Sequence, residues 1–322
     1  MRDFPRPRLA ASKCLGFAAC RYNGAIKTDA FVMKLAEFAE VLPVCPEMEI
    51  GLGVPRDPIR VVRGTGGLKL MQPTTGRDLT AEMETFCAAY VGNAADFDGF
   101  ILKEKSPSCG LSRVKIHKDL TREGAVAKGA GFFGGALRQA FPSHPLEDEG
   151  RLRNFTIREH FLTAIFALAD FRMMRENPAM RKLVDYQSRY KYLLMAYNRK
   201  ELKLLGKITA NSAPLPVEEV FADYENHLRA ALGKTPRFTS LINVLQHMAG
   251  HFSRLLNARE KKMFAEILEE YRAGQVPLSV PREILHSWVV RFDESYLAAQ
   301  AFFEPYPRAL TEISDSGKGR DY

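Results

Sequence analysis

At 322 residues, the chain is long enough for two domains that each bury a core of their own. Its 46% apolar and 26% charged residues are ordinary for a globular protein, so the composition gives no sign of a disordered chain. No apolar run is long enough to cross a bilayer, and the first seven residues lack the apolar core of a signal peptide, so we expect a cytoplasmic protein.

The N-terminal part of the chain alternates apolar, strand-like runs with segments of helical periodicity. This alternation predicts an α/β domain with an open, mainly parallel, Rossmann-like sheet and helices on its faces. Residues 51–78, rich in glycine, proline and arginine, are expected to form a long loop. The expected elements are a strand before Cys14, a helix over 28–40, a strand over 41–44, a helix over 80–90, a strand over 99–102 and a helix over 129–141.

The C-terminal part of the chain predicts an all-α domain. Asn198 with Glu201 three residues later resembles an N-cap pair, so a helix is expected to begin there. Other helices are expected over residues 158–174, 183–197, 217–232, 238–256, 258–273 and 281–303. We therefore expect an α/β domain over 1–145, a linking helical segment over 146–180, an all-helical domain over 181–310 and a flexible tail over 311–322.

Three of the five cysteines stand just beyond apolar, strand-like runs. They are Cys14, Cys45 and Cys109, and the last lies in a loop rich in serine and proline. Ligands of open α/β sheets gather beyond the carboxyl ends of the strands. The three thiols are therefore expected to converge, whereas Cys20 and Cys87 are expected to be packing residues.

Converging thiols have several interpretations. A structural zinc site normally takes four closely spaced ligands, and a catalytic cysteine needs only one thiol and a base. A cubane iron–sulfur cluster normally takes four cysteines, so three would leave one iron open to a substrate. Buried packing residues are the plain alternative. Near a cluster, Glu47 and Ser106 could move protons or position water, although both also suit an ordinary turn.

The positive charge is concentrated in the second part of the chain. Residues 151–322 carry 26 basic and 20 acidic side chains, and ten basic but three acidic residues lie between Arg172 and Lys207. On one continuous helix, spacing would place four of the basic residues on a single stripe: Lys182, Arg189, Lys200 and Lys207. Such a surface attracts polyanions, and phosphate binding without sequence-specific readout is expected.

Three motifs follow one another along residues 9–140. They are Cys14-Leu15-Gly16 with Arg21-Tyr22-Asn23-Gly24, Cys45-Pro46-Glu47 with Gly51-Leu52-Gly53-Val54-Pro55-Arg56, and Lys105-Ser106-Pro107-Ser108-Cys109-Gly110. Together they resemble the bacterial thiouracil desulfidase family. Residues 151–310 resemble the helical domain fused to its long members, which act on thiouridine in transfer RNA, with Lys191-Tyr192-Leu193-Leu194-Met195-Ala196 and Pro305-Tyr306-Pro307 as markers.

This resemblance implies a [4Fe-4S] cluster held by Cys14, Cys45 and Cys109, with one open iron that takes the thiocarbonyl sulfur while water attacks carbon. The resemblance also implies that Glu47 and Ser106 transfer protons and position the reacting groups. The implied reaction converts thiouridine in transfer RNA to uridine without net redox change. 4-Thiouridine is the first expectation, with 2-thiouridine or free thiouracil as alternatives. The rival interpretation is a non-catalytic iron–sulfur protein that binds RNA or senses oxidation.

The binding residues expected on this basis fall into two groups. Substrate contacts are expected from Arg21, Tyr22 and Ser108, and RNA contacts from Lys182, Arg189, Lys191, Lys200 and Lys207. Two features depart from the family pattern. Asn23 stands where an aspartate is usual, and the helical domain has Gln187, Tyr190 and Tyr197 where histidines are usual.

Overall fold

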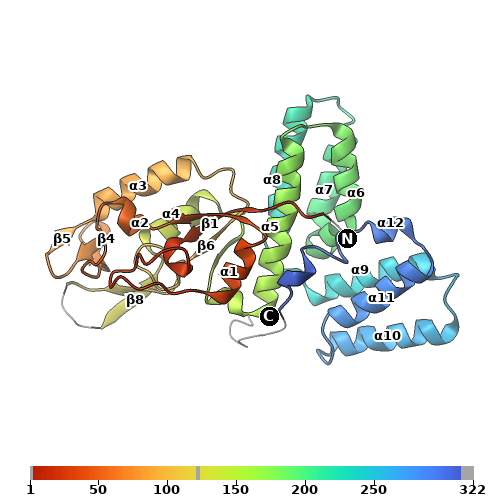
Figure 1. Ribbon diagram of the computed structural model, residues 1–322. Helices are drawn as coiled ribbons and strands as arrows, with labels where there is room; N and C mark the ends of the chain where they lie inside the picture. Colours follow the sequence, from red (N-terminus) through yellow and green to blue (C-terminus); the bar gives the residue numbers. More distant parts are fainter. Residues whose placement is uncertain (1–2, 121–123, 313–322) are drawn as a thin grey trace. The chain divides into compact units, whose positions relative to one another are not determined.

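The computed structural model describes residues 3–120 and 124–312 (Figure 1). The chain divides into two compact units, one built mainly of Pro5–Ala169 and the other mainly of Asp170–Arg308. Strands and helices alternate in the first unit, and the second is helical, which confirms the predicted fold class. Of the tail predicted over 311–322, residues 313–322 lie outside the described residues.

The first unit contains a fully parallel four-stranded sheet in the order β2-β1-β6-β9. Its β1 residues Leu9, Ala10 and Ala11 have no exposed surface, as is typical of a parallel strand covered on both faces. Because all four strands run in one direction, the segments that follow them share one edge of the sheet. The strands are β1 (Arg8–Ser12), β2 (Glu40–Val44), β6 (Gly99–Leu102) and β9 (Leu146–Asp148).

A second sheet in the order β5-β4-β3-β7-β8 makes the predicted loop over 51–78 wrong. Gly64 pairs with Gly67, so the β3–β4 hairpin turns through two residues. The glycine-rich run that favoured a loop is the turn of this hairpin. The strands are β3 (Arg60–Gly64), β4 (Gly67–Gln72), β5 (Arg77–Asp78), β7 (Val114–His117) and β8 (Ala125–Gly129).

One apolar core joins both sheets to two helices of this unit, α3 and α4. It includes Ala10 and Phe100 of the first sheet, Leu70 of the second, and Met83 and Leu137 from two helices, all with no exposed surface. The helices are α1 (Ala30–Ala36), α2 (Pro46–Glu49), α3 (Thr80–Gly92), α4 (Phe132–Ala140) and α5 (Phe155–Arg175). The predicted linking segment over 146–180 thus contains β9 and α5.

In the second unit, the four residues of the predicted basic stripe are divided between two helices, with Lys182 and Arg189 on α6 and Lys200 and Lys207 on α7. Asn198 has an extended backbone between α6 and α7, and its side chain accepts hydrogen bonds from the N–H groups of Lys200 and Glu201 at 3.1 and 3.2 Å. The helix start predicted at Asn198 is confirmed, and the single basic stripe on a continuous helix is wrong. None of the helices in the described residues is long and apolar enough to cross a bilayer. They are α6 (Met180–Tyr197), α7 (Arg199–Ala210), α8 (Val217–Leu232), α9 (Phe238–Ala249), α10 (Ala258–Arg272), α11 (Ser279–Arg291) and α12 (Ser295–Ala298).

Buried tyrosines occupy the core between α6 and α8. The Tyr224 hydroxyl donates to the Gln187 amide oxygen at 2.5 Å, and the Tyr190 hydroxyl donates to Asp170 at 2.8 Å. The rings of Tyr186 and Tyr190 stack with centroids 4.2 Å apart. Gln187 and Tyr190, which stand where the resemblance implies histidines, therefore belong to a buried, hydrogen-bonded aromatic core.

Candidate functional site

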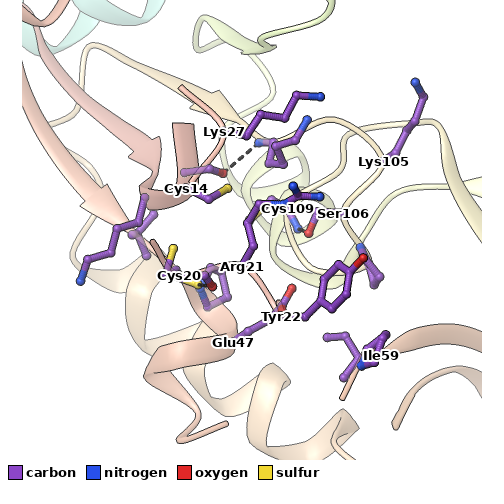
Figure 2. Close-up of a pocket in the computed structure, with 18 of the residues that line it drawn as sticks. Cys14, Cys20, Arg21, Tyr22, Lys27, Glu47, Ile59, Lys105, Ser106 and Cys109 are labelled. Carbon is purple, nitrogen blue, oxygen red and sulfur yellow. Dashed lines mark hydrogen bonds between the residues drawn. The ribbon is translucent and has the colours of Figure 1, made fainter. Parts of the chain in front are cut away.

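A pocket of about 390 Å³ lies at the carboxyl edge of the parallel sheet. Cys14, Cys45 and Cys109 all line it, as the strand directions predict, and Cys20 lines it as well. Figure 2 shows Cys14, Cys20 and Cys109 around this space together with Glu47 and Ser106. The structure therefore brings together thiols that are up to 95 residues apart in sequence.

Two of the three predicted ligands are held by the ends of their strands. Cys14 belongs to a short 3-10 helix directly after β1, where the Ser12 hydroxyl accepts a hydrogen bond from the Lys103 N–H at 2.8 Å and joins β1 to the end of β6. Cys45 is the N-cap residue of α2, directly after β2. Both thiols thus have a fixed backbone position at the sheet edge.

Cys109 is held by its loop. The Ser106 hydroxyl oxygen accepts hydrogen bonds from the N–H groups of Ser108 and Cys109, at 3.2 and 3.1 Å. The Gly110 N–H donates a hydrogen bond to the Ser106 carbonyl at 2.9 Å, which closes the turn. Ser106 therefore shapes the loop that carries the thiol, and its side chain also lines the pocket.

The first turn of α4 clamps the same loop through two glycines. The Phe132 and Gly134 N–H groups donate to the carbonyls of Pro107 and Ser108 at 3.1 and 3.0 Å, and the Gly131 N–H donates to Gly110 at 2.7 Å. These contacts satisfy N–H groups that a helix start otherwise leaves without partners. A Cβ at Gly134 would lie 2.5 Å from the Cys109 carbonyl oxygen, so only glycine permits this approach.

We therefore expect Gly134→Ala to displace the Cys109 loop and to destabilise the first unit by about 1–3 kcal/mol, the usual cost of overpacking. The matched control is the neighbouring Gly135→Ala, because a Cβ there meets Ala130 at an ordinary 3.5 Å. Alanine also has the higher helix propensity, so the control should be neutral or stabilising. Urea unfolding of both variants measures this difference. Equal free energies of unfolding for the two variants would show that the Cys109 loop can move to make room for the added Cβ without loss of stability.

Glu47 is fixed by two partners on opposite sides. One carboxylate oxygen accepts a hydrogen bond from the Ser108 hydroxyl at 3.0 Å, and the other accepts from the Arg56 guanidinium, whose Nε is 2.9 Å away. The Arg56 Nη1 also donates to the carbonyls of Cys20 and Gly53 at 3.0 and 2.9 Å. Glu47 thus has a defined orientation at the pocket wall.

The residues around Glu47 differ from the expectation in two respects. Ser108 was expected to contact substrate, but it is fully buried and its hydroxyl is directed to Glu47. Arg56 had no predicted role, although it closes the second motif and its side chain is only 4% exposed. Its proximity to Glu47 depends on a tight turn in which Gly51 and Gly53 have φ angles of 81° and 70°.

Arg21 and Tyr22, which were predicted to contact substrate, both line the pocket. Their turn is closed by a hydrogen bond from the Gly24 N–H to the Arg21 carbonyl at 2.8 Å. The Asn23 amide oxygen accepts from the Ala25 N–H at 3.2 Å, so Asn23 performs the turn-forming role that an aspartate could also perform. The Tyr22 ring remains 43% exposed and is accessible for stacking.

A buried ion pair lies behind Cys14 and was not predicted. Glu149, just beyond β9, pairs with Lys103 and accepts a hydrogen bond from the Glu104 N–H at 2.8 Å. Glu149 is only 3% exposed. The pair ties the end of β6 to the end of β9, so all four parallel strands contribute to the framework of the pocket.

The residues predicted to bind RNA have different environments. Arg189 forms an ion pair with Asp170 at 2.8 Å and lies over the Tyr190 ring, so it belongs to the tyrosine core of the helical unit. Lys182 donates to the Asn177 carbonyl at 2.9 Å, whereas Lys191 lies over the Tyr192 ring. Exposed lysines follow one another along one face of α7, namely Lys200, Lys203 and Lys207.

Comparison with known proteins identifies the first unit. The family model described as 2-thiouracil desulfurase matches residues 9–149, from β1 to Glu149. The uncharacterised protein YbbK of Bacillus subtilis (strain 168) is 31% identical over 139 residues, which are 41% of this chain and 90% of YbbK. The chain belongs to the 2-thiouracil desulfurase family. This result confirms the resemblance inferred from the three motifs.

Other similarities accompany this one. A family of unknown function, DUF1722, matches residues 191–307 of this 2-thiouracil desulfurase family member. The uncharacterised protein YbgA of Escherichia coli (strain K12) is 27% identical over 151 residues, which are 46% of this chain and 89% of YbgA. The solved structure of the [4Fe-4S]-dependent thiouracil desulfidase TudS is 27% identical, covers 46% of this chain and 93% of its own, and has a TM-score of 0.38.

The pocket thiols of this family member are a suitable donor set for an iron–sulfur cluster. Thiolates are the ligands that such clusters take. No three histidine, cysteine, aspartate or glutamate side chains of residues 3–120 and 124–312 lie close enough to hold a single metal ion. Cys14, Cys45 and Cys109 line a pocket of about 390 Å³, and the cysteines of a cubane bind different iron atoms.

Three of these thiols, those of Cys14, Cys20 and Cys109, hold their protons at neutral pH. Burial raises the pKa of Cys14 to about 11 and that of Cys20 to about 12, and it raises the pKa of Cys109 well above its ordinary value. Cysteine binds metal as the thiolate, so loading the pocket must release protons.

Cys20 and Cys87 were both expected to be packing residues, but their environments differ. Cys87 lies in α3, where it is buried in the apolar core. Cys20 lines the pocket, and its carbonyl oxygen accepts a hydrogen bond from the Cys45 thiol at 3.9 Å. Sequence spacing could not distinguish these two cysteines.

Proposed function

We propose that this protein is an iron–sulfur-dependent desulfidase that converts thiouridine in transfer RNA to uridine. The overall change is the replacement of a thiocarbonyl sulfur by the oxygen of water with release of sulfide, without net oxidation or reduction. The observation that carries the proposal is the meeting of three strand-end thiols with Glu47 in one pocket of a 2-thiouracil desulfurase family member. 4-Thiouridine is the first proposed substrate.

In this proposal, Cys14, Cys45 and Cys109 hold a [4Fe-4S] cluster. When bound, the cluster would supply an open, thiophilic iron that polarises the carbon–sulfur bond of the substrate. Burial of Cys45 and Cys109, 9% and 6% exposed, keeps most bulk water from their side chains. Hydrogen bonds of Ser12, Ser106 and α4 fix the backbone near Cys14 and Cys109, and Cys45 is fixed as the N-cap residue of α2.

Glu47 is the proposed base that takes a proton from the attacking water. Arg56 and Ser108 hold its carboxylate from two sides, so its direction is fixed before substrate binds. The Ser106 hydroxyl oxygen accepts hydrogen bonds from two N–H groups, so its own proton can be donated into the pocket. Arg21 and Tyr22 are proposed to hold the pyrimidine by stacking and hydrogen bonding.

The charge of the pocket supports an anionic substrate. Cationic side chains around it outnumber carboxylates, and an RNA phosphate beside the thiouridine would benefit from this surplus. The cationic residues are Lys13, Arg21, Lys27, Arg56, Lys103 and Lys105, against Glu47 and Glu104.

The test is an anaerobic reaction of the reconstituted protein with transfer RNA that contains 4-thiouridine. Nucleoside mass spectrometry should show that each thiouridine lost yields one uridine, and a sulfide assay should show one sulfide released. If free thiouracil reacts and transfer RNA does not, the substrate is the base. No reaction with either compound at full cluster occupancy would leave the rival reading, a non-catalytic protein.

That rival has one observation in its favour. Cys20 lines the same pocket as the three proposed ligands, so four thiols are available. A fourth cysteine ligand would close the cluster to substrate, as in electron-transfer or redox-sensing proteins.

We assign capture of transfer RNA to the helical unit, and in particular to the lysines of α7. The double variant Lys200→Glu with Lys207→Glu should bind thiolated and unthiolated transfer RNA more weakly to the same degree, because phosphate contacts carry no sequence information. The slope of log affinity against log salt should fall by about one for each lysine contact removed. Filter binding at several salt concentrations measures both effects.

The matched control is Lys262→Glu on α10, a lysine whose side chain is 79% exposed and outside the proposed surface. This control changes the net charge by half as much as the double variant. If it also loses half as much binding free energy, the effect is one of overall charge and not of α7. An unchanged salt slope in the double variant would remove α7 from the RNA-binding surface.

A further inference from the structure

Cys20 is the one pocket thiol that the proposed reaction does not use. Its side chain is 5% exposed, and that of Cys45 is 9% exposed, yet both line the pocket and are reachable from it. A small reagent that enters the pocket therefore meets both sulfurs. Cys87, a residue of α3 buried in the apolar core, does not line the pocket.

Cys20 and Cys45 also contact each other directly. The Cys45 thiol lies 3.9 Å from the Cys20 carbonyl oxygen. A charge on Cys45 also acts to raise the pKa of the Cys20 thiol, as expected for two neighbouring side chains, although 25 residues separate them. The Arg56 guanidinium, 3.0 Å from the same carbonyl, places a positive charge beside them, which opposes part of the rise that burial gives the pKa of Cys20.

We propose that Cys20 and Cys45 form a reversible disulfide when the pocket contains no cluster. One thiolate attacks the oxygen–oxygen bond of a peroxide and becomes a sulfenic acid as the first water leaves. The other thiol then displaces the sulfenic oxygen as a second water. Two thiols and one hydrogen peroxide thus give one disulfide and two waters, and a dithiol reverses the bond by exchange.

The consequence is a redox-dependent block on cluster assembly. The disulfide withdraws Cys45 from the proposed ligand set and protects it from irreversible oxidation. Formation of the bond requires the contact between the two thiols and a peroxide, but not the cluster. Its effect on cluster assembly rests on the proposed role of Cys45, so the two parts are measured separately.

The first experiment treats full-length, cluster-free protein with hydrogen peroxide. We expect loss of two of the five thiols, a mass decrease of two hydrogen atoms and a Cys20–Cys45 cross-link in non-reduced peptides. Cys87→Ser should behave as wild type, whereas Cys20→Ser should form no intramolecular disulfide. A cross-link between Cys14 and Cys109 as the main product, or sulfonic acids without any disulfide, would overturn the proposal.

The second experiment adds iron and sulfide to the oxidised protein. Oxidised wild type should gain no visible cluster absorbance until dithiothreitol is added, and then should gain as much as untreated protein. Full assembly on the mapped disulfide would overturn the proposed block. If even untreated protein assembles no cluster, the proposed function fails, while the disulfide result stands on its own.

Discussion

Cys109→Ala should remove most of the cluster from anaerobically reconstituted protein. Wild type should contain about four iron and four sulfide per chain, the composition of a cubane. Cys109 is 6% exposed and lies in a loop held by hydrogen bonds to α4, so its replacement leaves that position of the pocket without a thiol. Cys14→Ala and Cys45→Ala should have the same effect, measured by iron and sulfide analysis and by visible absorbance.

The control for this series is Cys87→Ala, which removes a buried thiol from α3 and should keep its iron. Cys20→Ala provides the decisive comparison. It should also retain the cluster, because Cys20 is proposed to pair with Cys45 only in the cluster-free protein. Iron loss in Cys20→Ala as large as that in Cys109→Ala would make Cys20 a fourth ligand and would refute the open iron.

Glu47→Gln should lower turnover about a hundredfold or more while the cluster stays intact, the usual scale for loss of a general acid–base group. Glutamine keeps the shape of the side chain, and its amide oxygen can still accept from Arg56 or Ser108. The amide cannot take a proton from water. Thiouridine loss in transfer RNA should be compared at equal cluster occupancy, with binding of the thiolated RNA measured separately.

Glu49→Gln is the matched control, because Glu49 lies on the same short helix but is exposed and outside the pocket. Its turnover should match that of wild type. Wild-type turnover in Glu47→Gln would transfer the base role to Ser106 or to another group. A Glu47→Gln protein that loses its iron would instead show that the Glu47–Arg56 pair supports the fold of the pocket.

The parallel sheet and its cysteines were predictable because their signals are local. An apolar run that ends at a polar loop marks a buried strand, and β6 begins and ends at the predicted residues. The rule that ligands gather at the carboxyl edge then brings distant thiols together without knowledge of the strand order. Hence Cys14, Cys45 and Cys109 could be grouped from the sequence.

The second sheet and the partners of Glu47 were not predictable in the same way. Strands β3 and β4 mix apolar with exposed polar residues, and the glycines of their turn dominated the pattern. Arg56 reaches Glu47 only because of the turn that contains Gly51 and Gly53. Ser108 lies 61 residues from Glu47, so their hydrogen bond depends on how two loops meet in space.

The strand order also determines when the thiol pocket can exist during synthesis. The Ser12 hydroxyl bonds to the Lys103 N–H, 91 residues later in the chain. Lys103 in turn pairs with Glu149, a further 46 residues on. The helix α4, which holds the Cys109 loop, lies between Lys103 and Glu149 in sequence. A ribosome adds about 5–20 residues per second, so Cys14 and Cys45 leave it seconds before their framework is made. Iron that reaches these early thiols finds neither the loop of Cys109 nor a closed sheet edge. If the pocket holds the proposed cluster, we therefore expect iron to load the finished, folded unit and not the growing chain.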